Sequence, residues 1–570
     1  MKNNNNKILA ALCVAFLMTP AYALEQVIYV YADRTPLTHS YEIVEVDELE
    51  DVSSIDILSS GPKGQMSSLY IRGADSDQSL IALNGIAIKD HSSPGGTDDL
   101  GQHNFTGISS VEIYKGPMSS LFGANAAGGV VNLVSDITGR SYIGSSLGSN
   151  NSVLAETQLS GSIKNLEYTL SIDGEQTDGI SVYPDGEETD PYENKNVNLN
   201  LLYSNNYNNL RLIHIDETNY SNLDSQGDTL NYTSKWNWKN TQLDYNNDTT
   251  RVTVNNSTHN RIYVKDDILE GQYDSKVNTA YVSKQIEDVI VGAEVEKIDA
   301  EFLLNTGGLY PYTSSVDKTR TTKGLFLNSN SVVKKNVVLS SGARYDSIDG
   351  FGEKTTGRLG LFVKGIRASV ATGYRVPTLY EMYGQDNYGF NGNPNLLEED
   401  TISYEVGYEN NISNTALFVI EEDNAIIYNG SYVNDTSTSY TKGIENKLTY
   451  ELKGVYIVNS VSVINAEQSN GDQKLRRPKV TNNLKLYRLV NDVVYSFDVN
   501  YYGKHKDIDS ITFRTIDIDA IITFDTELTY EKDNWELFAG IYNISNETYQ
   551  RPNGYSQLGR NAMMGFRKYF

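Results

Sequence analysis

The sequence predicts an all-β transmembrane barrel that follows a small N-terminal domain, and three observations support this. After residue 23, no stretch offers the roughly 18 apolar residues in a row that a membrane-crossing helix needs. From Tyr142 to Phe570 the chain instead alternates apolar and polar residues in short segments, which is typical of strands that face lipid on one side only. The chain also has 41 tyrosines, whose rings suit membrane interfaces while their hydroxyls stay hydrated. These features exclude an α-helical membrane protein and favour a barrel.

Residues 1–23 have the organisation of a secretory signal peptide. Lys2 and Lys7 flank an asparagine tract before an apolar run, Ile8–Met18, which is too short to cross a bilayer as a helix. The segment Ala21–Ala23 then supplies the small residues of an A-x-A cleavage site. The single cysteine, Cys13, lies inside this segment, so we expect the exported chain to use neither disulfide bonds nor thiol chemistry.

The region from Ser67 to Ser135 predicts a compact β-rich domain. Two short apolar strands, Leu69–Ile71 and Leu80–Leu83, end in the pairs Arg72-Gly73 and Asn84-Gly85, which are typical of tight turns with positive φ. The remaining elements are, in order, a strand Val111–Tyr114, the turn Lys115-Gly116-Pro117, a helical turn Met118–Phe122, the pair Gly128-Gly129 and a β-branched run Val130–Val134.

These segments resemble, in the same order, the plug domain of the TonB-dependent outer-membrane receptors. The family's IRG, (D/N)G, VEIxKGP and YGxxAxGGVVNI segments are matched at Ile71–Gly73, Asn84-Gly85, Val111–Pro117 and Phe122–Leu133. Phe122 stands where the family has tyrosine, which keeps the ring and loses the hydroxyl. The resemblance implies that residues 24–137 form an α+β plug inside a barrel of about 22 antiparallel strands, formed by residues 138–570. It also implies a monomer in the outer membrane of a Gram-negative bacterium, in contact with lipid.

The barrel half leaves one alternative to be weighed. Val197–Leu201 alternates cleanly, whereas Leu325–Asn328 is apolar at three successive positions. Strands at intervals of roughly 8 to 12 residues would also suit a soluble array of β-sandwiches. The signal peptide, the tyrosines and the terminal aromatic residue, Phe570, decide for the barrel, and Tyr542–Tyr549 and Gly554–Arg560 resemble the family's closing segments.

Within the family, several segments are most similar to the vitamin B12 (cobalamin) receptors. They are, in order, Gln65–Ser68 in the plug and then Tyr374–Gly384 (YRVPTLYEMYG), Gly392–Leu396 (GNPNL), Thr441–Glu445 (TKGIE) and Leu475–Lys479 (LRRPK). GNPNL and KGIE also occur in many siderophore receptors, so LRRPK and the plug segment are the more specific. The resemblance implies active import of vitamin B12 or another corrinoid. A ferric siderophore is the alternative, and haem is less supported because the histidines form no apical pair.

Energy coupling is predicted close to the cleavage site. The residues that resemble the family's TonB box are Glu25, Gln26, Val27, Ile28, Tyr29 and Val30. An extended segment of this kind can add as a strand to the sheet edge of a partner and carry force through main-chain hydrogen bonds. The implied partner is TonB of the inner-membrane energy-coupling complex, since a barrel in the outer membrane has no access to ATP. The alternative is an ordinary first strand of the plug.

The ligand is expected between the plug apex and the extracellular loops. The polar, glycine-rich stretch His91–Asn104 suits an apex, where Ser92, Ser93 and Thr97 could hydrogen-bond the amide groups of a corrin. For any one of these residues, a solvated loop position is the competing interpretation. Arg72 is expected to be structural, as a buried arginine that pairs with carboxylates of the barrel.

A structural calcium ion is predicted in two early extracellular loops. B12 receptors order the corresponding loops with calcium bound by aspartates, and oxygen ligands suit a hard cation. The candidate ligands here are Asp185, Asp190, Glu193 and Asp216, although Ser181 and Tyr192 stand where the family pattern has aspartates. The competing interpretation is a solvated acidic loop on a chain with a formal charge of −26.

Other function classes are disfavoured. The six histidines are scattered without metal-ligand spacing, and no nucleophile elbow, zinc-protease motif or phosphate loop occurs, so we expect neither an enzyme nor a required cofactor. The acidic charge repels nucleic acid. A barrel enzyme or a passive porin would lack the plug, and a filled lumen cannot conduct freely.

Overall fold

In a computed structural model, the structure describes residues 38–570 except 94, 136, 138, 225–228, 230, 307–311 and 386–390. The predicted signal peptide and TonB box lie outside the described residues. Among the residues described, no helix has the length and apolar character needed to cross a membrane.

The N-terminal domain is built on a five-stranded sheet with the order β1-β6-β7-β4-β5. Its strands are β1 (Tyr41–Val44), β4 (Ser79–Leu83), β5 (Ile86–Ile88), β6 (Ser110–Lys115) and β7 (Gly129–Val134), and only β4 and β7 pair in parallel. A hairpin of β2 (Ile55–Ser59) and β3 (Ser67–Ile71) lies beside it, with the short helices η1 (Val46–Asp51), η2 (Ser76–Gln78), η3 (Leu100–Gln102) and α2 (Ser119–Phe122). The predicted plug strands are thus confirmed as β3, β4, β6 and β7.

The two predicted tight turns adopt the predicted backbone. Arg72 and Gly73 have φ values of 53° and 74°, and Asn84 and Gly85 have 49° and 81°. Asparagine and glycine tolerate this left-handed region well, whereas arginine does not, so the position of Arg72 depends on the contacts of its side chain.

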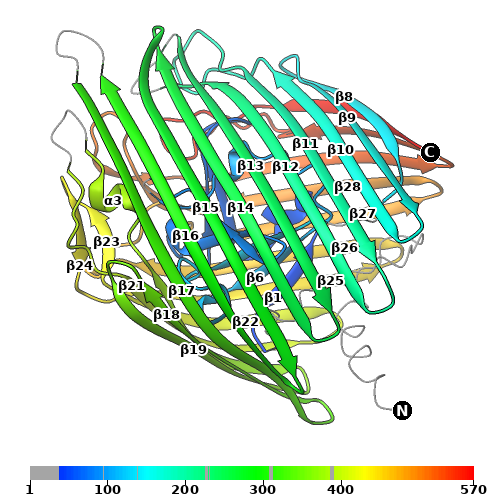
Figure 1. The fold of residues 1–570 in the computed structure, drawn as a ribbon. Helices are drawn as coiled ribbons and strands as arrows, with labels where there is room; N and C mark the ends of the chain where they lie inside the picture. Colours follow the sequence, from blue (N-terminus) through cyan, green and yellow to red (C-terminus); the bar gives the residue numbers. More distant parts are fainter. Residues whose placement is uncertain are drawn as a thin grey trace.

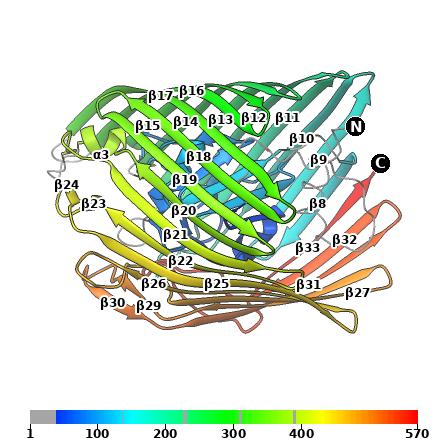
Figure 2. The same ribbon diagram turned by 90° about the horizontal axis from the view of Figure 1, so that it is seen from below.

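The rest of the chain forms a closed barrel of 22 antiparallel strands, in which β33 pairs with β8. The strands are β8 (Tyr142–Gly148), β9 (Val153–Ile163), β10 (Leu166–Thr177), β11 (Tyr192–Ser204), β12 (Asn208–Asn222), β13 (Tyr232–Asn247), β14 (Thr250–Lys265), β15 (Ile268–Ile286), β16 (Val289–Thr306), β17 (Tyr312–Lys334), β18 (Val337–Ile348), β19 (Gly352–Val363), β20 (Ile366–Arg375), β21 (Glu399–Glu409), β22 (Ser413–Asp423), β25 (Ser439–Leu452), β26 (Val455–Glu467), β27 (Val480–Val490), β28 (Val493–Tyr502), β31 (Ile521–Lys532), β32 (Trp535–Tyr542) and β33 (Asn561–Tyr569). The plug, blue in Figures 1 and 2, lies inside this ring of strands.

The two ends of the barrel differ in the length of their connections. One end has tight turns such as 164–165, 364–365 and 453–454, and the other has long loops that carry α3 (Leu379–Tyr383), the hairpin of β23 (Ala425–Tyr428) and β24 (Tyr432–Asp435), and the hairpin of β29 (His505–Ile508) and β30 (Thr515–Ile518). Figure 1 shows α3, β23 and β24 at the end away from the C-terminus. Because outer-membrane barrels place short turns in the periplasm and long loops outside, α3 and these hairpins mark the extracellular end.

The alternation seen in the sequence is an alternation between lipid and lumen. On β11, Val197 is 38% exposed on the outer face while Asn198 is 2% exposed on the inner face. The less regular segment on β17 has the same geometry: Leu325 and Leu327 are exposed, and Phe326 points inward, where its ring stacks on Tyr281 at 5.5 Å. Three apolar residues in a row therefore reflect an apolar contact inside the lumen rather than a break in the strand.

Candidate functional site

A buried ionic cluster joins the plug to the barrel at Arg72. Its Nη2 lies 2.6 Å from Glu445 Oε1 on β25, its Nη1 lies 2.7 Å from Glu405 Oε2 on β21, and its guanidinium carbon lies 4.4 Å from the centre of the Phe418 ring. The expected pairing of this arginine with barrel carboxylates is confirmed. Arg72 is only 1% exposed, so it has no surface to offer a ligand in this state.

The neighbouring motif residue Lys115 extends the cluster. Its Nζ lies 2.6 Å from Glu42 Oε1, and Lys447 of the barrel lies 3.1 Å from the other oxygen of Glu42. Burial alone would raise the pKa of Glu42, but Lys115 and Lys447 lower it to about 2. Glu42 therefore stays ionised and bridges the plug and the barrel.

The glycine pairs of the plug motifs make room for close packing. Gly116 has a φ of 86° and donates its N–H to the carbonyl of Gly128, which closes the turn that contains Pro117. A Cβ on Gly129 would lie 2.5 Å from the carbonyl oxygen of Tyr114 on the neighbouring strand. A side chain at Gly129 would therefore push β6 and β7 apart.

A second charged cluster, which sequence reasoning did not find, lies around His103. Its Nε2 lies 2.5 Å from Asp98 and its Nδ1 lies 3.0 Å from Glu217 on β12, while His259 on β14 lies 3.2 Å from the other oxygen of Asp98. Burial lowers the pKa of His103, but Asp98 and Glu217 outweigh it and raise this pKa to about 10. The rings of Trp236 and Trp238 lie 5.1 and 4.7 Å from the His103 ring.

The plug apex is held by its own hydroxyl groups. Ser92 is fully buried and donates to Asp90 Oδ1 at 2.5 Å, and Ser93 donates to the Asp90 carbonyl and accepts from the N–H of Gly96. The hydroxyl of Ser92 therefore stabilises the apex, and its contact with a ligand stays a prediction. Ser93 and Thr97 are partly exposed, and their contact with a ligand stays a prediction.

Beside the apex, aromatic side chains line the inner face of the barrel near its extracellular end. We call this set the aromatic wall. Successive ring centres are 5.5 to 6.4 Å apart along the series Tyr232, Tyr263, Tyr273, Tyr380 and Phe302. Three cations lie over rings of this region: Arg261 over Tyr273 at 4.9 Å, Lys265 over Tyr232 at 5.7 Å and Lys318 over Tyr383 at 4.7 Å. The wall suits a large ligand with flat or anionic groups.

The segment LRRPK of the loop between β26 and β27 contacts the plug directly. Arg477 donates to the carbonyls of Gly73 and Ala74 and pairs with Asp75, and Lys474 bridges Asp75 at 2.9 Å and Glu422 at 2.6 Å. Arg477 of LRRPK and the adjacent Lys474 therefore hold the plug just after Arg72.

The predicted calcium ligands do not come together as predicted. Glu193 faces outward and pairs with Lys195 at 2.6 Å, Asp216 faces outward and pairs with Lys239 at 2.8 Å, and Asp185 is exposed on the loop. The cause is strand alternation, because the inward neighbours of Glu193 and Asp216 point into the lumen and these two residues therefore cannot.

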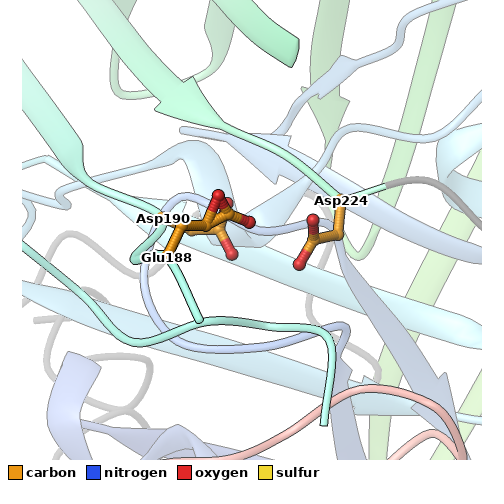
Figure 3. Close-up of side chains that lie close together, drawn as sticks. All are labelled: Glu188, Asp190 and Asp224. Atoms are coloured by element: carbon orange, nitrogen blue, oxygen red, sulfur yellow. The ribbon is translucent and has the colours of Figure 1, made fainter. Parts of the chain in front are cut away.

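A different acidic group gathers around Asp190. Oxygen atoms of Glu188, Asp190 and Asp224 all lie within 4.8 Å of one another, and Figure 3 shows their carboxylates close together on two chain segments. Backbone N–H groups of Val182 and Tyr183 donate to Asp190 and Asp224, each at 2.8 Å, and hold the two loops in place. Only oxygen ligands are offered, which fits calcium better than a softer metal.

Comparison with known proteins identifies the two domains. Residues 136–544 match the family model described as TonB dependent receptor-like, beta-barrel, and residues 46–130 match the TonB-dependent Receptor Plug Domain. A relative is the vitamin B12 transporter BtuB of Vibrio cholerae serotype O1, which is 24% identical over 551 residues that cover 90% of this chain and 87% of the relative.

Solved structures of similar fold are siderophore receptors. A mutant of the ferric enterobactin receptor PfeA from Pseudomonas aeruginosa, in complex with enterobactin, has a TM-score of 0.77 at 17% identity and covers 94% of this chain and 100% of that one. The ferric yersiniabactin uptake receptor FyuA from Yersinia pestis has a TM-score of 0.71 at 18% identity and covers 94% and 98%. The family model spans most of the chain, the plug lies inside a 22-strand barrel, and the plug motifs occur in order. This chain therefore belongs to the TonB-dependent receptors of the Gram-negative outer membrane.

Proposed function

We propose that this receptor imports vitamin B12 or another corrinoid across the outer membrane. The observation that carries the proposal is the similarity to the vitamin B12 transporter BtuB along nine tenths of the chain, together with LRRPK at the plug contact. The aromatic wall supports it, since flat rings can pack against a corrin while hydroxyls bond its amide groups.

A ferric siderophore is the second candidate. Lys265 and Lys318 bring positive charge to the aromatic wall of an otherwise acidic chain, and such charge attracts an anionic iron chelate. Arg261 contributes less, because it is paired with Asp90 at 2.8 Å. The fold of the solved siderophore receptors is the same, although at under 20% identity this likeness speaks for the fold alone.

Energy would reach the plug through the segment Glu25–Val30. In the proposed mechanism this segment adds to a sheet edge of TonB, and a pull transmitted along the chain loosens the ionic clusters around Arg72 and His103. The plug then shifts and the ligand passes.

Calcium is proposed as a structural ion at Glu188, Asp190 and Asp224. The three carboxylates come from the loop after β10 and the segment after β12, so an ion held by them would tie two extracellular loops together above the lumen. It would order the ligand site and take no part in a reaction.

The test is a titration of the purified, detergent-solubilised receptor with cyanocobalamin, with and without calcium, beside a panel of ferric siderophores. Saturable corrinoid binding supports the proposal, and calcium dependence supports the acidic site. If the receptor binds only an iron chelate, its substrate is a ferric siderophore rather than a corrinoid.

A further inference from the structure

Four consecutive barrel strands carry buried arginines on their inner face. β20 has two, of which Arg375 ends the strand and pairs with Glu381 and Glu399, and the other four arginines form a series. They are Arg320 on β17, Arg344 on β18, Arg358 on β19 and Arg367 on β20, and we call them the arginine ladder. The strands lie side by side in Figure 2 and pair in this order. No other run of neighbouring strands in the described part of the barrel carries such a series.

The ladder descends from the extracellular end to the periplasmic end. Arg344 pairs with Phe326, which lies six positions nearer the periplasm than Arg320 on the same strand. Arg358 pairs with Gly342, two positions below Arg344, and Arg367 pairs with Phe362, four positions below Arg358. The guanidinium groups thus mark a line along one wall between the barrel and the plug.

Two of the four arginines have no carboxylate within salt-bridge distance in the described structure. Arg320 donates to the carbonyl of Pro377 at 2.7 Å, and Arg358 donates to Asn328 while its Nε and Nη1 have no acceptor among the described residues. A buried cation without a paired anion is costly, so a chain with an excess of carboxylates would be expected to pair it. Arg320 also contacts the Met382 sulfur at 3.4 Å and the Phe351 ring at 5.1 Å, whereas Arg358 leaves two buried donors that are available to a group outside the chain.

The plug side of this wall adds no negative charge next to the unpaired arginines. His39 faces Arg358 and Arg367, and burial together with Arg358 lowers its pKa to about 3, so it stays neutral. His91 lies close to Arg320, and both of its ring nitrogens lack partners among the described residues. Next to Arg344, a cavity of about 10 Å³ lies between Gly123 of the plug and Thr322 of the barrel, with room for about one water molecule. Two carboxylates also line it, and both are paired: Glu294 with Arg344 and Glu296 with Lys89.

We propose that the arginine ladder lines the path by which the ligand passes the plug, and that this path is built for a ligand with anionic oxygen atoms. The proposal rests on the proposed function as an importer. Guanidinium groups bind phosphate, carboxylate and catecholate oxygens through paired N–H donors. Once the plug moves, an anionic group of the ligand would bind successive arginines on its way toward the periplasmic end. The small cavity shows that the path is closed in this conformation. The phosphodiester of a complete corrinoid and the oxygens of a ferric chelate share this chemistry.

The first test locates the path without any ligand. In a Cys13→Ser background, Thr356→Cys places a thiol on the inner face of β19 between Arg344 and Arg358, and Ser462→Cys places a matched thiol on β26, where Ser462 contacts Ser54 of the plug at 2.9 Å. Energised cells are labelled with an anionic and a cationic methanethiosulfonate reagent. We expect energy-dependent labelling at Thr356→Cys, on the order of tenfold faster with the anionic reagent, and no charge preference at Ser462→Cys.

Arg358→Gln in the Thr356→Cys chain should reduce the preference for the anionic reagent, and Arg358→Lys should keep most of it. Equal labelling at the two thiols, a preference for the cationic reagent, or no energy-dependent labelling at Thr356→Cys would each overturn the proposal. Heat-modifiable gel migration of the barrel confirms that each variant folds.

The second test reads the charge of the cargo by uptake into cells. Arg358→Gln should slow uptake of cyanocobalamin about tenfold, corresponding to roughly 1.4 kcal/mol, while uptake of cobinamide, which lacks the phosphodiester, stays unchanged. If the cargo is an iron chelate, a ferric catecholate should be slowed and a neutral ferric hydroxamate should not. Equal effects on the charged and neutral probes would overturn the anionic path. If no probe enters wild-type cells, the proposed substrate is wrong, and the thiol labelling still decides the path.

Discussion

Replacing Arg72 by methionine should loosen the plug while the barrel stays folded. The change removes a buried cation that holds Glu445 at 2.6 Å and Glu405 at 2.7 Å. Breaking a buried ion pair by removing one partner costs about 3 to 5 kcal/mol, because the remaining charge stays in the interior. Glu405 keeps Arg367 at 2.8 Å, so the low end of about 3 kcal/mol applies here. At about 1.4 kcal/mol per factor of ten, the plug strands should open roughly a hundredfold more often.

Hydrogen exchange followed by mass spectrometry measures this opening. At constant pH, amides of β3 and β6 should exchange about a hundredfold faster in Arg72→Met, while amides of β14–β16 exchange at the wild-type rate. The control is Arg476→Gln, which breaks a partly exposed pair with Asp507 and should change exchange less than about fivefold. The double variant Arg72→Met with Glu445→Gln should recover part of the loss, since it removes an uncompensated charge. A change below about fivefold at β3 in Arg72→Met would refute the argument.

Four further outcomes are expected. Plug stability, measured by the fluorescence of Trp236 and Trp238 in urea, should decrease from pH 6.5 to pH 10. The pKa of His103 is raised to about 10 in the folded plug, so His103 stabilises the plug fully below pH 6.5 and loses this contribution as the pH rises through 10. His103→Gln should make plug stability less dependent on pH over this range. Asp190→Asn should weaken calcium binding about tenfold or more in a calorimetric titration, since it removes one of three carboxylates, and unchanged affinity would place the ion elsewhere. Deletion of Glu25–Val30 should abolish uptake and spare surface binding, and surviving uptake would contradict the coupling assignment. Tyr273→Ala should raise the dissociation constant of the cargo about tenfold, because it removes an aromatic contact. If the fraction of folded barrel falls by the same factor, the weaker binding reflects misfolding and the aromatic contact is refuted.

Local signals in the sequence were sufficient for the fold. The pair Asn84-Gly85 strongly favours a tight turn, and alternation such as Val197–Leu201 is typical of a strand with two different environments. A buried arginine in an acidic chain usually pairs with carboxylates, so the pairing of Arg72 was also predictable, although Glu405 and Glu445 were not identifiable as its partners.

The site depended on contacts between residues far apart in the chain. His103 and His259 look unrelated in sequence and meet at Asp98 only because the plug lies against β14. The four residues predicted to hold calcium do not meet, because proximity in sequence does not say which face of a strand a residue occupies, and Glu193 occupies the outer one. The tyrosines were assigned to the membrane interfaces, whereas Tyr263 and its neighbours line the lumen.

The inner surface of the barrel has a consequence for how the plug moves. On β11 the lumen side presents Asn194, Asn196, Asn198 and Asn200 in succession, all buried against the plug. When the plug withdraws, each of these amides exchanges a protein partner for water at little net cost. On β12 and β13, by contrast, Ile213, Ile215, Trp236 and Trp238 pack against the apolar core of the plug and lose that contact. The asparagine row should add little to the heat-capacity change of opening, whereas exposure of the apolar patch should raise the heat capacity. A force from the inner membrane therefore meets little resistance along the asparagine row of β11, and is opposed mainly by the charged contacts and by the apolar patch on β12 and β13.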